Sequence, residues 1–330
     1  MSSIQEVAKK AGVGVGTVSR VINDSGYVSE KTRRKVEEVI EELNYKPNEL
    51  ARNLFRNRTN IVAVITPAIG NPYYATLCSE VESRLRKYGY KTMLCNTIGE
   101  ATNEEAYLEM LERNMVDGII TGTHTLDYSS YKKIKGPIIG FDTPKLNDDI
   151  LIVTVDHEKG GKLAAKALIE SGCKEVLQFT DATTKNYPFI KRHTAVAREI
   201  NKAGIICHEY KPDIDNFEEK FIKENIEEAF KLYPNVDGLF ATDTHALLYM
   251  KKALHLGKKI PEDLKIVAYD GTFVLNTAYP SLTAIVQPID ELAKVAVDSL
   301  HAIINGENVD RKTKVLDIEF RQGMTTNRKR

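Results

Sequence analysis

Near the start of the 330-residue chain lies a glycine-rich stretch, GVGVGTVSR at residues 12–20. It combines three glycines, which lack side chains, with two hydroxyl groups and one guanidinium. Glycines in such a run suit a loop that binds phosphate groups. A dinucleotide-binding loop needs the spacing G-x-G-x-x-G between a strand and a helix. Gly12 and Gly14 fit this spacing, but Thr17 occupies the third glycine position, which argues against a dinucleotide.

Polar residues also end many of the apolar runs in the rest of the chain: Thr66, Asn96, Asp142, Asp156, Asp181, Asp243 and Asp270. Open α/β sheets bind ligands at the carboxyl ends of their strands, where carboxylates suit the hydroxyl groups of a sugar. The other interpretation is that an aspartate at a strand end only caps the following helix. For any single one of these residues, helix capping is the more frequent role.

Residues that could catalyse a reaction or hold a metal ion do not gather in the sequence. The seven histidines form neither HExxH nor H-x-H, and G-x-S-x-G does not occur. The four cysteines are scattered without a CxxC pair, so neither a zinc site nor a disulfide framework is indicated. We therefore expect no enzyme, no metal and no cofactor.

Three short helices are predicted around the glycine-rich stretch. Ser3 and Glu6 form a capping box in front of a first helix, which ends at Gly12. A second helix covers about residues 15–23, and Ser29 caps a third. A helix instead of a strand before Gly12 removes the dinucleotide interpretation. The arrangement matches a helix-turn-helix unit that binds DNA.

Charge is unevenly distributed, although the net charge of the chain is zero. Residues 1–60 hold 11 Lys and Arg against 8 Asp and Glu, a net charge of +3, which permits nucleic acid binding without proving it. The N-terminus has no apolar leader, and no run of about 18 apolar residues occurs. We expect a cytoplasmic protein that associates with the nucleoid through DNA and not with a membrane.

A further short helix is predicted after Pro47, with Asn48 as its N-cap and Leu50 and Leu54 on one face. A helix of about two turns is marginal alone because its nucleation is costly. It would need a partner or DNA to fold against. The alternative is an ordinary linker helix that packs Leu54 into a core.

From residue 61 onward, apolar runs alternate with amphipathic segments. This alternation predicts doubly wound α/β domains with buried parallel strands, and the number of runs predicts two subdomains. The predicted strands cover 61–66, 90–96, 117–122, 137–142, 151–156, 175–181, 237–243 and 264–270. Helices are predicted at 73–87, 158–171, 195–203, 218–232 and 290–307.

The sequence IQEVAKKAGVGVGTVSRVINDSGYVSEKTRRKVEEVIEELNYKPNELARNL resembles the DNA-binding headpiece and hinge of the LacI/GalR family of bacterial repressors. The stretches GYVSEKT and YKPNELARNL also resemble those of the sucrose-operon-type repressors of Gram-positive bacteria. The resemblance implies a homodimer on a pseudo-palindromic operator, with the second helices in the major groove and paired hinge helices in the minor groove. The residues that it assigns to DNA are Val15, Gly16 and Arg20 as base readers, Thr17, Ser19 and Asn23 beside them, and Leu54 as a wedge flanked by Arg52 and Asn53.

The rest of the chain resembles the effector core of that family, which has the two-lobed fold of periplasmic sugar-binding proteins. The resemblance implies a headpiece at 1–46, a hinge helix and linker at 47–60, and a core at 61–330. The chain would cross between lobes near 157–162, 287–292 and 320–324 and hold the effector in the cleft. The implied effector-binding residues are Tyr73, Tyr74, Asn186, Arg192, Phe217, Thr242, Asp243, Asp270 and Gln287.

Two residues depart from the family's pattern at these positions. Ala195 replaces the glycine that follows the arginine, and Thr242 replaces the usual asparagine. The contacts of any one sugar therefore do not transfer directly to this chain.

Together these features predict a DNA-binding transcriptional repressor whose operator affinity is controlled by a small carbohydrate, with sucrose, fructose and a phosphosugar as candidates. One alternative keeps the DNA-binding role and makes a purine or a phosphorylated carrier protein the regulator. The helix at 290–307 lacks the adjacent arginine pair expected for such a carrier protein. A second alternative, a solute-binding protein, predicts a signal peptide and no headpiece, contrary to this sequence.

Overall fold

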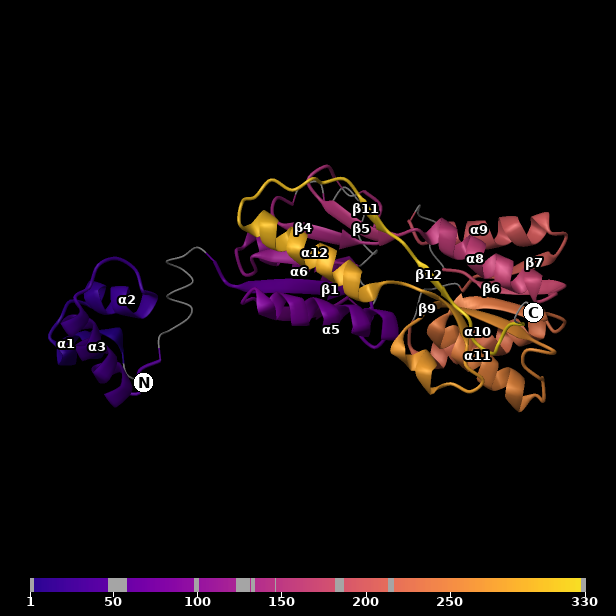
Figure 1. Ribbon diagram of the computed structural model, residues 1–330, viewed down its shortest axis with the longest axis horizontal. Helices are drawn as coiled ribbons and strands as arrows, with labels where there is room; N and C mark the ends of the chain where they lie inside the picture. Colours follow the sequence, from indigo (N-terminus) through magenta and orange to yellow (C-terminus); the bar gives the residue numbers. More distant parts are fainter. Residues whose placement is uncertain are drawn as a thin grey trace. The chain divides into compact units, whose positions relative to one another are not determined.

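The computed structural model describes residues 3–46, 58–97, 101–122, 131, 134–145, 147–181, 187–212 and 217–327. The chain divides into two compact units, Met1–Thr59 and Asn60–Arg330 (Figure 1). Within the described residues, no helix combines the length and the apolar character needed to cross a membrane.

The N-terminal unit is helical over residues 3–46, which we call the headpiece. It contains α1 (Ile4–Ala11), α2 (Val15–Asn23) and α3 (Glu30–Glu42). Each helix contributes small apolar side chains to one core: Val7, Ala8 and Ala11 from α1, Val18 and Val21 from α2, and Val36 and Val39 from α3. The predicted helix-turn-helix arrangement is confirmed.

Local sequence signals determine how α1 begins and ends. The Ser3 hydroxyl accepts a hydrogen bond from the Glu6 backbone N–H, and the Glu6 carboxylate accepts one from the Ser3 N–H, so the predicted capping box is formed. Gly12 ends the helix at a φ of 63°. Glycine adopts this left-handed conformation without a steric penalty, which allows the tight turn into α2.

The first lobe of the second unit is a parallel sheet with the strand order β11-β5-β4-β3-β1-β2. Its strands are β1 (Ile61–Thr66), β2 (Lys91–Asn96), β3 (Gly118–Thr121), β4 (Ile138–Phe141), β5 (Leu151–Val155) and β11 (Lys314–Leu316). Helices α5 (Pro72–Lys87) and α12 (Ile289–Ile304) run alongside each other on this lobe, as Figure 1 shows, and α6 (Ala101–Glu112) also contacts the sheet.

The second lobe has the strand order β12-β10-β9-β8-β6-β7, and within it only β12 pairs antiparallel among the described strands. Its strands are β6 (Glu175–Phe179), β7 (Ile206–Tyr210), β8 (Gly238–Thr242), β9 (Lys265–Asp270), β10 (Thr283–Val286) and β12 (Glu319–Arg321). Its helices are α8 (His157–Glu170), α9 (Ile190–Lys202), α10 (Glu219–Leu232), α11 (Asp243–His255) and the 3₁₀ helix η1 (Phe273–Thr277).

Helices cover both faces of each sheet. In β9, Val267 and Tyr269 join the apolar cluster that contains α8 and α9, whereas Ile266 and Ala268 join the cluster that contains α10 and α11. Successive side chains of a strand point to opposite faces, so a strand buried on both sides needs a continuous apolar run. The predicted doubly wound α/β fold is confirmed.

The chain passes between the two sheets three times. It leaves β5 through Asp156 to α8, leaves β10 through residues 287–288 to α12, and leaves β11 through residues 317–318 to β12. The predicted intervals 157–162 and 287–292 begin at the first two passages. The third passage precedes the predicted interval 320–324, which starts inside β12.

Several elements have no counterpart among the predicted ones: α6, α11, β7, β10, β11 and β12. Strand β7 lies at a sheet edge, where only its last residue, Tyr210, is buried, so its sequence ICHEY lacks a continuous apolar run. Strands β11 and β12 have three residues each, which is too short for a periodic signal. Helix α9 begins at Ile190, five residues before the predicted start at 195.

The contact between α8 and α9 is close enough to require glycine. A Cβ atom at Gly161 would lie 2.3 Å from the carbonyl oxygen of Arg192 and 2.8 Å from the Cβ of Ala195. Real Cβ atoms do not approach backbone this closely, so any larger residue would push the helices apart. Gly161 thereby sets the position of the first turn of α9, which carries Arg192.

Candidate functional site

The surface of α2 presents the residues that the sequence assigns to base contacts. Val15 is 42% exposed, and Arg20 is exposed as well. Gly16 has open space where a side chain would stand, with no atom within 4 Å of an ideal Cβ. An apolar group, a bare backbone position and a guanidinium thus share one short exposed helix, as base contacts in a groove require.

The three neighbouring residues on α2 are less available. Thr17, Ser19 and Asn23 are half-buried. The Asn23 side-chain amide donates to the Ser19 carbonyl oxygen at 2.9 Å and contacts the Ser19 hydroxyl at 3.3 Å. Asn23 therefore closes the last turn of α2, and its amide N–H groups are partly used inside the headpiece.

Ion pairs within the headpiece occupy several of its basic residues. Arg33 pairs with Asp24 at 2.8 Å, Lys10 with Glu42 at 2.5 Å and Arg34 with Glu30 at 3.3 Å. Arg20 takes part in no ion pair with any residue from 3 to 46. Its guanidinium thus remains available for an external acceptor.

The turn between α2 and α3 carries a residue that the sequence analysis did not assign. Tyr27 is 90% exposed. Gly26, which precedes it, has a φ of 70°, and an ideal Cβ there would lie 3.5 Å from the Arg20 Cδ atom. Tyr27 and Arg20 therefore flank the same turn. In the sequence, the feature that could have identified Tyr27 was an aromatic residue in an otherwise polar turn.

The hinge candidates Arg52, Asn53 and Leu54 lie outside the described residues.

In the second unit, polar side chains from both lobes converge at the carboxyl ends of the strands. Burial raises the pKa of Tyr74 on α5, and the negative charges of Asp142, Asp181 and Asp270 raise it further. Such an effect requires all three carboxyl groups to lie near this ring. Asp142 follows β4 of the first lobe, whereas Asp181 and Asp270 lie at the ends of β6 and β9 of the second. We call this group, with Tyr73 and Arg192, the strand-end cluster.

Arg192 is the cation of the strand-end cluster and is only 7% exposed. Its guanidinium carbon lies 4.7 Å from the ring centroid of Tyr269 and 5.5 Å from that of Phe189. An Nη2 atom lies 3.4 Å from the Asp181 carboxylate. Burial lowers the pKa of Arg192, but the charge of Asp181 and its other acidic neighbours outweighs burial, so the net shift is upward. The guanidinium stays charged.

Asp181 is the main countercharge of Arg192. Burial alone would raise the pKa of its carboxyl group, but a hydrogen bond from His193 and the charge of Arg192 lower it well below its usual range. Asp142 behaves similarly, because the charge and hydrogen bond of His157 outweigh the effect of burial. Both carboxylates are therefore ionised at neutral pH.

Asp243 and Asp270 form a second acidic pair with a different role. Both oxygens of Asp243 accept hydrogen bonds from the Gly271–Thr272 segment, namely from the Gly271 N–H at 3.1 Å and from the Thr272 N–H and hydroxyl at 2.6 Å. Burial raises the pKa of Asp243 to about 6. Burial and the charge of Asp243 raise that of Asp270 well above its usual range. Asp243 thus fixes the turn after β9.

Gln287 extends the strand-end cluster at the second passage between the sheets. Its amide donates to Asp270 at 2.8 Å. The side-chain oxygen of Gln287 is buried and has no hydrogen-bond partner among the described residues, and the residue is 4% exposed. A buried acceptor without a partner is unfavourable by about 1–3 kcal/mol, so this position suits a ligand that donates a hydrogen bond.

Aromatic side chains also meet across the two lobes. The rings of Tyr73 and Tyr74 are 5.3 Å apart, and Tyr74 meets Phe217 of the second lobe edge-on at 6.1 Å. Thr242 instead contacts His245 Nδ1 at 3.0 Å. Of the residues assigned to the effector, Asn186 lies outside the described residues.

A buried histidine that the sequence analysis did not assign connects the lobes. His157 is 1% exposed, and its Nε2 atom lies 2.9 Å from Asp142 and its Nδ1 atom 2.8 Å from the Tyr269 hydroxyl. Asp142 also accepts from Thr154 at 2.5 Å. The signal in the sequence was the position of His157 directly after the strand-end residue Asp156.

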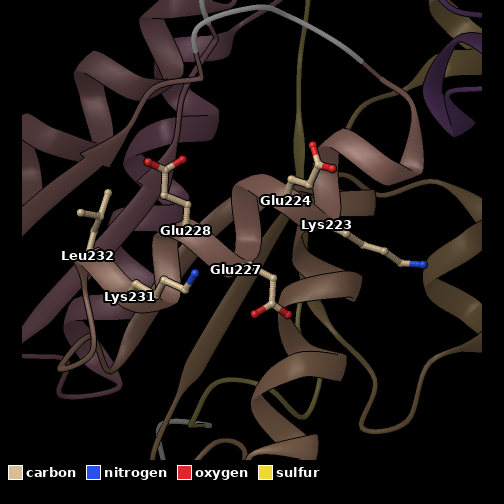
Figure 2. A pocket seen from close by; sticks show the side chains of 6 residues that line it. All are labelled: Lys223, Glu224, Glu227, Glu228, Lys231 and Leu232. Carbon is tan, nitrogen blue, oxygen red and sulfur yellow. The ribbon is translucent and has the colours of Figure 1, made fainter.

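A separate hollow of about 640 Å³ lies on the surface of α10, away from the strand-end cluster. Figure 2 shows the side chains that line it, all from one exposed stretch of this helix: Lys223, Glu224, Glu227, Glu228, Lys231 and Leu232. Glu227 is paired with Lys252 at 2.5 Å, and Glu228 accepts from the Tyr210 hydroxyl at 2.7 Å. These contacts are typical of a solvated helix face.

Among the described residues, no group of three or more His, Cys, Asp or Glu is arranged to hold a metal ion.

Comparisons with known proteins match both units. Residues 3–48 match the model for bacterial regulatory proteins of the lacI family, and residues 165–326 match the periplasmic binding protein-like domain. The sucrose operon repressor of Streptococcus mutans is 39% identical over 303 residues, which are 91% of this chain and 92% of that protein. The ribose operon repressor of Halalkalibacterium halodurans is 34% identical over 313 residues, 94% of this chain and 92% of that protein.

A solved structure extends the similarity of the core. It is a periplasmic binding protein/LacI transcriptional regulator from Alkaliphilus metalliredigens QYMF complexed with D-xylulofuranose. It is 28% identical with a TM-score of 0.74, and the match covers 82% of this chain and all of that one.

Proposed function

The chain belongs to the lacI family of bacterial regulatory proteins, and from this premise we propose that it represses transcription under the control of a small carbohydrate. Its relatives are transcriptional repressors, so the chain is a DNA-binding regulator and not an enzyme. In our proposal the carbohydrate binds at the strand-end cluster and changes the affinity of the headpiece for its operator. The observation that carries the proposal is the convergence of both lobes on Arg192.

For DNA binding, we assign base contacts to Val15, Gly16 and Arg20. Val15 suits a thymine methyl group, Gly16 allows the backbone close to the groove wall, and Arg20 can bind guanine through two hydrogen bonds. Thr17, Ser19 and Asn23 would contact phosphate or support the helix. Tyr27 joins this set because it is exposed and directly follows Gly26, the residue beside the Arg20 side chain.

The hinge is assigned from the sequence alone. Leu54 would wedge between the central base pairs, with Arg52 and Asn53 in the minor groove. A short helix that folds only on DNA would be the order–disorder element through which the effector acts. Leu54→Ala should weaken binding to the operator at least tenfold while leaving binding to unrelated DNA nearly unchanged. An equal loss on both would refute the wedge.

For the effector, the strand-end cluster supplies what a sugar needs. Tyr73, Tyr74 and Phe217 offer ring faces and edges, and Arg192, Asp270 and Gln287 offer hydrogen-bonding groups. The named relatives repress sucrose and ribose operons, and the solved relative holds D-xylulofuranose. These names support a carbohydrate over a purine or a phosphorylated carrier protein.

We further propose that the protein acts as a homodimer on a pseudo-palindromic operator. Leu94 is exposed on β2, the edge strand of the first lobe, and Phe273 and Tyr279 are exposed near η1 of the second lobe. A subunit interface would cover such side chains. Two-fold symmetry of the protein would match two operator half-sites.

Operator binding of the full-length chain tests the proposal. Operator affinity should fall steeply with salt, because each phosphate contact releases a counterion. Adding sucrose, fructose or ribose should change that affinity, and Arg20→Ala should reduce operator preference by roughly tenfold or more, as expected for loss of a bidentate base contact. Binding that is indifferent to salt would contradict the DNA role, and indifference to every sugar would contradict the effector role.

A further inference from the structure

The strand-end cluster contains more negative than positive charge. Arg192 is its one cation among the described residues, and its nearest countercharge, Asp181, lies 3.4 Å away. Asp142 also acts on Arg192, because its charge helps to raise the pKa of the guanidinium. An incoming anion would therefore meet a guanidinium whose charge is already compensated by carboxylates.

The two histidines that act on Asp181, His193 and His245, do not add positive charge. Burial lowers the pKa of His193 and lowers that of His245 to about 4. The Nε2 atom of His193 lies 3.1 Å from the Arg192 Nε atom and 3.3 Å from the Asp181 carboxylate. Both imidazoles are therefore neutral at pH 7 and give a phosphate group no electrostatic attraction.

The hydrogen-bonding groups that await a ligand are mainly acceptors. The carboxylates of Asp142 and Asp181 are ionised, and the side-chain oxygen of Gln287 is buried without a donor among the described residues. Sugar hydroxyl groups can donate to all three. A phosphate dianion presents only acceptor oxygens and would leave them unsatisfied while adding like-charge repulsion.

From this charge and hydrogen-bond balance we propose that the effector is an uncharged polyhydroxy sugar and that the site rejects phosphorylated sugars. The inference rests on the proposed effector role of the strand-end cluster and narrows its ligand class. Asp181 is the residue that most directly sets the selectivity, because it neutralises Arg192 from the second lobe.

The test is calorimetric titration of the full-length chain with sucrose, fructose and ribose, and with sucrose 6-phosphate, fructose 1-phosphate, fructose 6-phosphate and ribose 5-phosphate. At least one free sugar should bind, and its phosphate ester should bind at least tenfold more weakly. This ratio should shrink as ionic strength rises, because salt screens the repulsion of the ester. An ester that binds as tightly as its parent sugar would overturn the inference and leave the proposed effector role intact. Binding by no compound in either set would overturn both.

Two variants with the same change in net charge test whether Asp181 causes the discrimination against the phosphate ester. Asp181→Asn removes one carboxylate beside Arg192 and should reduce the discrimination against the ester at least threefold. Asp298→Asn makes the same change in net charge on the outer surface of α12, where Asp298 pairs with Lys294, and should leave the ratio unchanged. Equal ratios in wild type and Asp181→Asn would mean that Asp181 does not set the selectivity. Circular dichroism verifies that both variants are folded.

Discussion

The imidazole of His157 and the carboxylate of Asp142 lie 2.9 Å apart and join the second lobe to the first. On its other side, His157 contacts the Tyr269 hydroxyl at 2.8 Å, and the Tyr269 ring supports the Arg192 guanidinium. His157 thus uses both ring nitrogens, Nε2 toward the first lobe and Nδ1 toward the second. His157 therefore links both lobes to Arg192, the residue that we propose binds the effector.

Replacing this imidazole should destabilise the core. His157→Phe leaves the Asp142 carboxylate with Thr154 as its donor and removes the hydrogen-bond partner of the Tyr269 hydroxyl. A loss of about 2–4 kcal/mol in the free energy of unfolding is expected for such buried polar groups. Urea denaturation followed by circular dichroism measures it.

The matched control is His208→Phe, which breaks a half-exposed contact with Glu175 at 3.2 Å inside the second lobe. Its loss should stay below about 1 kcal/mol. Similar losses for both variants would mean that the bridge contributes no more than a surface pair.

Acidification should destabilise the core before the carboxylates titrate. Burial lowers the pKa of His245 to about 4, whereas an unfolded histidine has a pKa near 6.5. Between these values the unfolded chain binds more protons, so stability falls as pH falls, by up to about 1.4 kcal/mol per pH unit from this residue. Denaturation curves from pH 7 to 4 should show this slope, and His245→Gln should flatten it.

Asp243 should act in the opposite direction over part of that range. Its pKa is raised to about 6, so between pH 4 and 6 the folded chain holds a proton that the unfolded chain releases. Its contribution to stability therefore grows as pH falls. Asp243→Asn should make the acid destabilisation steeper, and a shallower slope in this variant would contradict the assignment.

The contact between α8 and α9 predicts a severe effect from a single methyl group. Gly161→Ala would force the Arg192 backbone away and should reduce the free energy of unfolding by more than about 2 kcal/mol. It should also weaken effector binding, because Arg192 moves with α9. Gly70→Ala, where no atom lies within 4 Å of the new Cβ, should change stability by less than about 0.5 kcal/mol.

In the headpiece, the same substitution should have the opposite sign. Gly16 lies inside α2 with open space around it, so Gly16→Ala should stabilise the headpiece by about 0.5–1 kcal/mol. Thermal unfolding of the headpiece signal measures this gain. A change in operator preference would indicate that the backbone at Gly16 approaches the groove closely. An unchanged preference would show that the glycine is not needed there.

Much of this architecture could be predicted from the sequence because its signals are local. The capping box at Ser3, the glycine turn at Gly12 and the continuous apolar runs of β1 and β9 each depend on a few neighbouring residues. The edge strand β7 and the three-residue strands β11 and β12 could not be predicted, because they pair with strands from distant parts of the chain.

The site was predictable only in part for the same reason. Arg192, Asp270 and the aromatic pair could be assigned from their places in the sequence, but the use of Asp243 as a support for the Gly271–Thr272 turn depends on the fold. His157 looked like an isolated histidine because its partners, Asp142 and Tyr269, come from different lobes. Only tertiary structure reveals a residue that connects them.

The three passages between the sheets also constrain how the protein is made. The core of the first lobe contains α12, whose Leu292 and Leu300 pack in one cluster with Val62 and Val64 of β1. During synthesis, these N-terminal strands leave the ribosome more than 200 residues before their C-terminal helix does. The second lobe lies between them in the chain and can complete most of its own sheet first. The first lobe to be translated is therefore the last that can finish folding, and a chain truncated before residue 289 would lack a wall of its core.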